Sequence, residues 1–164
     1  MFMKKGLTAL ALAAALVATG CTTKPAEDPN QGQQQQGTTI TPGSVRDFEV
    51  NVGNTVLFDF DSFALTPSAR TTLDKQAAWL QQYPQVTFTV EGHADERGTR
   101  EYNLALGARR ANSVRDYLVS KGIAASRITT TSYGKERPAC LESNEACWAE
   151  NRRGVTALAS GAAS

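Results

Sequence analysis

Apolar and polar residues alternate strictly over residues 86–91, VTFTVE. A period of two is typical of a half-buried strand, with Val86, Phe88 and Val90 on the buried face. Three other short segments are rich in apolar, β-branched or aromatic residues. We therefore expect four strands, the other three covering residues 54–60, 128–133 and 154–158.

Two longer segments carry apolar residues at helical spacing. The first begins at Thr66-Pro67, which supply an N-cap and a first-turn proline, and runs to about Tyr83, before Pro84. The second covers about residues 100–120 and ends near Gly122. The buried stripes contain Leu73, Ala77 and Leu80 in the first helix and Leu104, Ala108, Ala111, Val114 and Leu118 in the second. This order of elements, with a loop before the last strand, predicts an α+β fold with both helices on one face of a small sheet.

Residues 1–20 have the features of a secretory signal peptide, because two lysines precede an uncharged alanine- and leucine-rich stretch that ends in small residues. This stretch is shorter than the roughly 20 apolar residues of a membrane-spanning helix, so we expect no transmembrane helix. Residues 18–21, ATGC, resemble the bacterial lipobox, although Ala18 stands where leucine is usual. The resemblance implies an acylated Cys21. The alternative is a secreted protein with a free thiol at that position.

The next segment, residues 21–44, holds prolines, glycines and a run of four glutamines but hardly any apolar side chain. Such a composition cannot bury enough surface to order itself and predicts a flexible tether of at most about 75 Å. Residues 45–164 have a length suited to one domain with one modest core.

The chain has three cysteines, an odd number for an exported protein. If Cys21 is acylated, Cys140 and Cys147 remain, and we expect them to form a disulfide in an oxidising compartment. Two free thiols or a metal-binding pair are the alternatives, although His93 is the only histidine available as a further ligand.

Removal of the signal peptide leaves fifteen basic and sixteen acidic residues, a net charge of −1. This balance does not suit a nucleic-acid-binding protein, and we expect no nucleic-acid partner.

Candidate chemistry is concentrated in the charged, glycine-containing segment between the second strand and the second helix, residues 91–103. Arg109 and Arg110 follow on the helix, and residues 151–153, NRR, open the last strand. Loops at strand ends commonly carry binding sites, and these three segments could converge in the predicted fold.

The sequence resembles the OmpA-like peptidoglycan-binding domain family, and within it the group of peptidoglycan-associated lipoproteins. The residues that carry the resemblance are FDFDS (58–62), EGHADERGTREYNLALGARRA (91–111), SYGKERP (132–138) and NRR (151–153). The resemblance covers roughly residues 45–158 and implies a mixed four-stranded sheet. The pair Cys140 and Cys147 departs from many members of the family.

The resemblance implies non-covalent binding of diaminopimelate in the peptidoglycan stem peptide. In the family's pattern Asp95 and Arg110 are the main contacts, an acid for the ligand's ammonium group and a fork-shaped base for its carboxylate. Without the resemblance, Arg110 could equally form a surface salt bridge and Asp95 could cap a turn. Arg109 is expected to be exposed. The resemblance also suggests weaker contacts from Phe60, Asp61, Ser62, Arg97, Asn103, Leu106 and Arg153.

The family resemblance further implies a lipid-anchored protein of the outer membrane with its domain in the periplasm. It implies membership of the Tol-Pal envelope and cell-division system, with the propeller protein TolB as a partner. The alternative function is that of a periplasmic, metal-dependent cell-wall hydrolase. Glu91, His93 and Asp95 would be its best metal ligands, but a lone histidine is more often structural. The sequence contains no HExxH or Ser-x-x-Lys motif, and we expect no catalytic residue, metal or cofactor.

Overall fold

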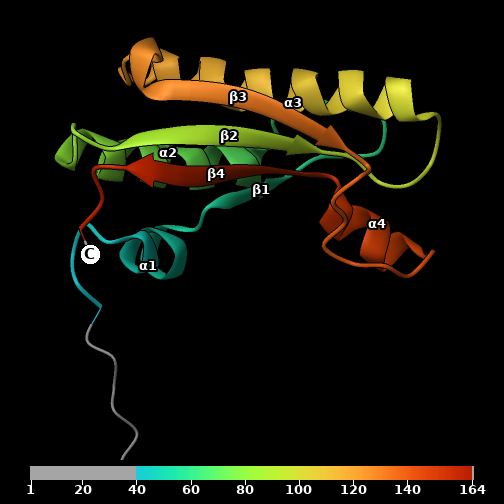
Figure 1. Ribbon diagram of the computed structural model, residues 1–164, viewed down its shortest axis with the longest axis horizontal. Helices are drawn as coiled ribbons and strands as arrows, with labels where there is room; N and C mark the ends of the chain where they lie inside the picture. Colours follow the sequence, from blue (N-terminus) through green and yellow to red (C-terminus); the bar gives the residue numbers. More distant parts are fainter. Residues whose placement is uncertain (1–39, 164) are drawn as a thin grey trace, which may run out of the picture. The chain divides into compact units, whose positions relative to one another are not determined.

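The computed structural model describes residues 40–163, so the predicted signal peptide, the predicted acylation site Cys21 and most of the predicted tether lie outside the described residues. Figure 1 shows the arrangement of the elements. In chain order these are α1 Val45–Asp47, the π-helix η1 Phe48–Val52, β1 Thr55–Leu57, α2 Pro67–Gln82, β2 Thr87–His93, α3 Arg100–Ser120, the 3₁₀ helix η2 Ala125–Arg127, β3 Ile128–Gly134, α4 Glu145–Asn151 and β4 Arg153–Ser160.

The four strands form one mixed sheet in the order β1-β4-β2-β3. β2 and β3 are parallel, and β4 is antiparallel to both of its neighbours, β1 and β2. Both α2 and α3 pack against the same face of this sheet and contact each other. The structure therefore confirms the α+β prediction, including the two main helices on one face of a mixed four-stranded sheet.

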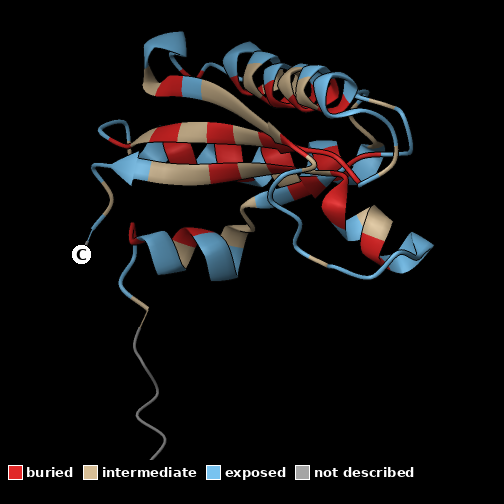
Figure 2. Cartoon of the chain, turned by 45° about the vertical axis from the view of Figure 1, so that its right-hand side comes forward, coloured by how far each residue is buried: buried red, intermediate tan, exposed pale blue. Residues whose placement is uncertain are grey.

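The core follows the predicted periodicity, except that Leu104 and Ala108 of α3 are only half-buried and Leu106 is buried instead. Val86, Phe88 and Val90 are at most 1% exposed, and Figure 2 shows buried residues at alternating positions along β2. They face Leu73 and Leu118, which are fully buried on the helices. Because burial of one such side chain contributes roughly 1.5–3 kcal/mol, this face contributes much of the stability of the domain.

The predicted helix boundaries are confirmed by their caps. The hydroxyl of Thr66 accepts a hydrogen bond from the Ala69 amide at 3.1 Å, and Thr99 caps α3 in the same way through the Tyr102 amide at 3.2 Å. At the other end of α3, Gly122 has a φ of +94°, which only glycine adopts without strain.

Two sequence-based predictions need correction, and one segment for which no element was predicted is helical. The first strand ends at Leu57 and does not reach residue 60, because the chain turns at residues 59–62, where the Ser62 amide bonds the Asp59 carbonyl at 3.2 Å. The segment before β1 is helical, capped by Ser44, and it buries Phe48 against Trp79 with ring centroids 4.9 Å apart. The presumed loop before the last strand contains α4, capped by Asn144.

The disulfide between Cys140 and Cys147 is present, with 5.0 Å between the two Cα atoms. No helix within residues 40–163 is long and apolar enough to span a membrane.

The end of β2 lies directly against α3 because two glycines meet there. A Cβ atom at Gly92 would overlap the carbonyl oxygen of Gly107, and one at Gly107 would overlap the Ser132 hydroxyl and approach the Gly92 carbonyl to 2.8 Å. This close approach sets the height of α3 above the strand that leads into the charged loop.

We expect Gly92→Ala to lower the free energy of unfolding by more than about 3 kcal/mol, because the overlap is with backbone that cannot rotate away. The half-exposed Thr89→Ala on the same strand is the control and should cost under about 1 kcal/mol. Urea denaturation measures both. Equal stabilities of the two variants would contradict the close packing of β2 and α3.

Candidate ligand-binding site

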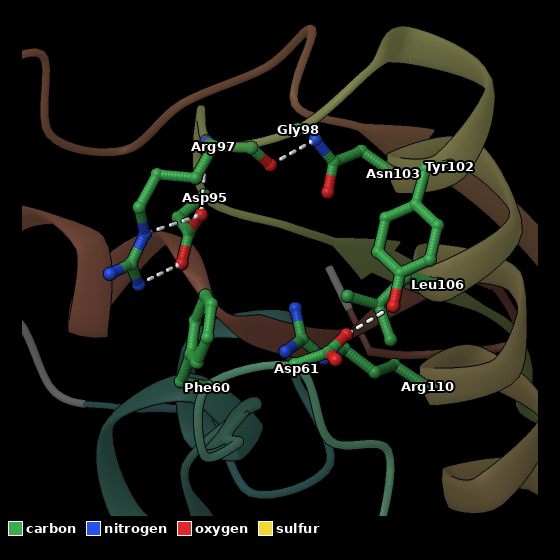
Figure 3. A pocket seen from close by; sticks show the side chains of 9 residues that line it. All are labelled: Phe60, Asp61, Asp95, Arg97, Gly98, Tyr102, Asn103, Leu106 and Arg110. Atoms are coloured by element: carbon green, nitrogen blue, oxygen red, sulfur yellow. Dashed lines mark hydrogen bonds and ion pairs between the residues drawn. The ribbon is translucent and has the colours of Figure 1, made fainter.

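A cavity of about 170 Å³ opens beside the N-terminal half of α3 (Figure 3). It is formed where the turn after β1, the loop after β2 and α3 meet. The residues that line it are Phe60, Asp61, Asp95, Arg97, Gly98, Tyr102, Asn103, Leu106 and Arg110. Seven of the nine ligand contacts proposed from the sequence are among them, and only Ser62 and Arg153 are absent. The structure thus brings together segments that lie up to about fifty residues apart.

Arg110 is completely buried at the base of the cavity. Its guanidinium donates to three backbone carbonyl oxygens, those of Ser62 at 2.8 Å, His93 at 2.8 Å and Asp59 at 3.1 Å. Within residues 40–163 it forms no ion pair with a carboxylate. Burial lowers the pKa of Arg110 to about 10, so the group remains protonated at neutral pH. It is a buried cation held by neutral groups.

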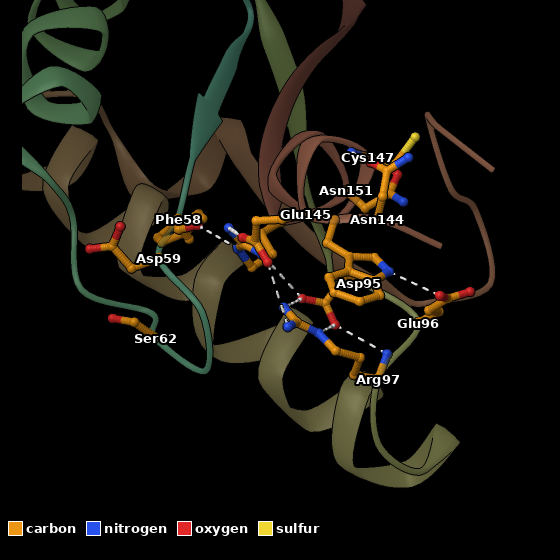
Figure 4. Close-up of polar contacts among 12 residues, drawn as sticks. Phe58, Asp59, Ser62, Asp95, Glu96, Arg97, Asn144, Glu145, Cys147 and Asn151 are labelled. Atoms are coloured by element: carbon orange, nitrogen blue, oxygen red, sulfur yellow. Dashed lines mark hydrogen bonds and ion pairs between the residues drawn. The ribbon is translucent and has the colours of Figure 1, made fainter. Parts of the chain in front are cut away.

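Asp95 is also buried, with 5% of its surface exposed, but it is fully paired. Arg97 reaches its carboxylate with Nη2 at 2.7 Å and Nε at 3.2 Å (Figure 4), and Nη1 of Arg152 lies 3.4 Å from it. Burial by itself raises the pKa of Asp95, but the hydrogen bonds and charge of the two arginines outweigh it and hold the pKa below its usual value.

Arg97 lies between two aromatic rings. Its guanidinium carbon is 4.1 Å from the ring centroid of Phe60 and 4.2 Å from that of Trp148. The Arg97 carbonyl accepts a hydrogen bond from the buried side-chain amide of Asn103 at 2.8 Å. The flat guanidinium is therefore fixed at the side of the cavity, between stacked rings and the Asp95 carboxylate.

Asp61 provides the second carboxylate, at the exposed mouth of the cavity. It is the one non-glycine residue with a positive φ, 52°, among the residues that the structure describes. The Tyr102 hydroxyl donates to its carboxylate. A strained backbone held in place by its surroundings is common at binding sites.

Ser62 and Arg153 were predicted to contact the ligand but do not line the cavity, and their hydrogen bonds explain why. Ser62 contributes its carbonyl to Arg110, while its hydroxyl accepts from the Ala64 amide at 3.1 Å. Arg153 is the first residue of β4 and donates to the Arg137 carbonyl at 3.2 Å, away from the cavity. Its neighbour Arg152 is the one that reaches Asp95.

Sequence reasoning missed Tyr102, Gly98, Arg152 and Trp148. Tyr102 could have been found, because residues 102, 106 and 110 are spaced by four and share one face of α3. Trp148 could not, because α4 was taken for a loop, and Arg152 lay within the NRR motif but was not distinguished from Arg153.

The residues considered for a metal site do not form one. His93 is 3.7 Å from Glu91, but Asp95 is occupied by arginines. In the described part of the chain, no three His, Cys, Asp or Glu side chains are grouped as metal ligands would be.

Residues 57–152 match the model of the OmpA family. The chain belongs to the OmpA family. Relatives in Mesorhizobium japonicum and Brucella melitensis, both named peptidoglycan-associated lipoprotein, are 55% and 52% identical to it. These matches cover 94% and 92% of this chain and 92% and 90% of the relatives.

Two solved structures have a similar fold. The peptidoglycan-associated lipoprotein of Burkholderia pseudomallei is similar with a TM-score of 0.63 and 40% identity, over 65% of this chain and 90% of that one. The C-terminal domain of Helicobacter pylori MotB, at 21% identity, has a TM-score of 0.61 over 65% of this chain and 84% of that one, and shows the fold alone. The chain is a member of the OmpA family and not an enzyme.

His93 lies behind the cavity, and its stability effect is separable because it is the only histidine. Burial and the nearby charge of Arg153 lower its pKa from 6.5 to about 4. Between these two values the unfolded chain binds a proton that the folded domain does not, so the stability of the domain falls as the pH is lowered.

We therefore expect acidification from pH 7 to pH 4 to reduce the free energy of unfolding by up to about 3 kcal/mol. His93→Gln, which remains neutral throughout, should lose most of this dependence. Chemical denaturation of both proteins at half-unit pH intervals measures the free energy of unfolding as a function of pH. If the free energy of unfolding of the variant falls with pH as steeply as that of the parent protein, groups other than His93 cause the pH dependence.

Proposed function

We propose that this chain is an outer-membrane lipoprotein whose domain binds peptidoglycan non-covalently, with the zwitterionic end of a diaminopimelate residue in the cavity. Arg110 is the observation that carries the proposal. A buried cation without a carboxylate partner is costly, and an anionic ligand would relieve that cost. A planar guanidinium is also suited to gripping a carboxylate.

The ligand's ammonium group requires a carboxylate that can still accept hydrogen bonds. Both oxygens of Asp95 already accept from arginines, whereas Asp61 is exposed and accepts from Tyr102. We infer that Asp61 receives the ammonium group first, and that Asp95 contributes directly only where Arg97 gives way. The cavity then offers one cation and one anion to a ligand with both charges.

The size of the cavity limits what enters it. Pockets that hold whole drug-sized molecules have volumes of roughly 300–1,000 Å³, against about 170 Å³ here. The end of one long side chain fits this space, while the rest of the polymer would remain outside. The exposed rings of Phe60 and Tyr102 border that outer region.

The cellular role that we propose follows the names of the relatives. They are called peptidoglycan-associated lipoproteins, which supports acylation at Cys21 and a domain that ties the outer membrane to the cell wall. Participation in the Tol-Pal cell-division system, with TolB as a partner, is part of the same proposal.

Asp61→Asn should weaken binding to a soluble muropeptide that contains diaminopimelate by about three- to thirtyfold, because the charge that meets the ammonium is lost. Asparagine tolerates a positive φ, so the turn should keep its shape. The matched control is Asp59→Asn, two residues earlier in the same turn. Its exposed carboxylate forms no ion pair or side-chain hydrogen bond within residues 40–163. Calorimetric titration compares the two, and equal affinities would contradict the role of Asp61.

Arg110→Lys should abolish most binding to purified peptidoglycan, because lysine keeps the charge but not the planar fork. It should also lower the melting temperature, since three carbonyl groups lose their donor. The exposed neighbour, Arg109→Lys, should retain both binding and stability. Pull-down at a temperature where circular dichroism shows both variants folded separates the two effects. Wild-type binding by folded Arg110→Lys would reject the site.

Cys21→Ser should leave the protein outside the membrane fraction, because acyl chains contribute roughly 0.8 kcal/mol per buried CH₂ to anchoring. Fractionation of cells after digestion of peptidoglycan tests this. If the variant still sediments with outer membranes as the parent does, the lipid anchor is disproved.

A further inference from the structure

Helix α4 borders the binding site, although it lies about fifty residues after Asp95 in the chain. Trp148 stacks on Arg97, and its indole N–H donates to Glu96 at 2.9 Å. Glu145 accepts from Arg152 at 2.8 Å and lies 3.6 Å from Arg97. Figure 4 shows Glu145 next to Asp95 and Arg97, with Cys147 and Asn151 of the same helix farther from them. One side of α4 is thus part of the wall that holds Arg97.

Few contacts outside the binding site hold α4 and the segment that leads into it against the domain. The helix has seven residues, and isolated helices shorter than about 12 are barely stable in water. Beneath the segment that leads into it, a second cavity of about 150 Å³ lies between Pro138, Cys140, Leu141 and Glu142 on one side and Ala94 and Glu96 on the other. Leu141 itself is 83% exposed. Packing of this segment against the rest of the domain is therefore incomplete.

Two features close the segment on itself. The disulfide joins Cys140 in the incoming segment to the buried Cys147 inside α4. The side chain of Asn151 accepts from the Ala139 amide at 2.7 Å and donates to the Cys140 carbonyl at 2.7 Å. Cys147 immediately precedes Trp148, so the disulfide fixes the turn of helix that carries the stacked ring.

We propose that the disulfide-braced α4 positions Arg97 for the ligand, with Trp148 as the positioning residue, so that peptidoglycan binding depends on the disulfide. This inference rests on the proposed function of the cavity. With the brace intact, Trp148 and Phe60 hold the Arg97 guanidinium flat against Asp95, and the side of the cavity keeps its shape. With the brace opened, α4 loosens and Arg97 loses one of its two rings.

Opening the brace is a two-electron reduction. A dithiol supplies two electrons and two protons, the sulfur–sulfur bond becomes two thiols, and the dithiol closes to its own disulfide. The main hydrophobic cluster contains neither cysteine, although Cys147 is buried. The fold should therefore survive reduction of the disulfide.

The test measures the affinity of the mature full-length protein in detergent for a soluble muropeptide that contains diaminopimelate. We expect Trp148→Leu, which keeps the disulfide, to weaken binding by about 2- to 30-fold, the range of one cation–π contact. Trp148→Phe should recover most of the loss. Dithiothreitol, or Cys140→Ser with Cys147→Ser, should weaken wild-type binding by a similar factor while circular dichroism remains unchanged.

The decisive comparison is between the two perturbations. If the disulfide acts through Trp148, dithiothreitol should weaken the wild type but leave Trp148→Leu unaffected. Glu150→Ala, an exposed substitution in α4, is the control and should bind as the wild type does. Equal affinities of oxidised and reduced wild type, or full affinity of Trp148→Leu, would overturn the inference while leaving the proposed function intact. Failure of the oxidised wild type to bind would overturn the proposed function itself.

Discussion

The guanidinium of Arg110 is the contact on which the site depends. With three hydrogen bonds to backbone carbonyls it joins the turn after β1, the end of β2 and helix α3. Each of these elements supplies cavity residues, so one buried side chain fixes their relative positions. Because carbonyl groups carry only partial charges, the arginine keeps most of its positive charge available to a ligand. The arrangement that fixes the fold is therefore also the one that we propose for binding.

The long helices and strands could be predicted from the sequence because their apolar residues recur at the spacing of the buried face. Alternation over residues 86–91 placed β2, and Thr66, Pro84 and Gly122 marked the ends of helices. The short elements could not be predicted in this way. α4 has only seven residues, and its helical structure depends on the Asn144 cap, the disulfide and contacts with Arg97 and Glu96, which no local pattern reveals.

The residues of the candidate site likewise divide into those that could be predicted from the sequence and those that could not. The motif resemblance singled out seven residues that the fold brings to one cavity, and helical spacing would have added Tyr102. The resemblance did not distinguish Arg152 from Arg153. Arg152 faces the site because β4 begins one residue later and because Glu145 of α4 accepts a hydrogen bond from it, whereas Arg153 donates to the Arg137 carbonyl. Nor did the resemblance reveal that Asp95 is already paired with two arginines, which is why we propose the exposed Asp61 as the first contact of an ammonium group.

The central claim is that Arg110 receives a carboxylate from the end of a stem-peptide side chain. The most direct measurement compares the calorimetric affinity of the protein for two synthetic stem peptides, one with diaminopimelate and one with lysine at the same position. Lysine keeps the ammonium group and lacks the terminal carboxylate. The account predicts that the lysine peptide binds about 10- to 100-fold more weakly, as expected for one charge-assisted contact. Equal affinities for the two peptides would contradict it.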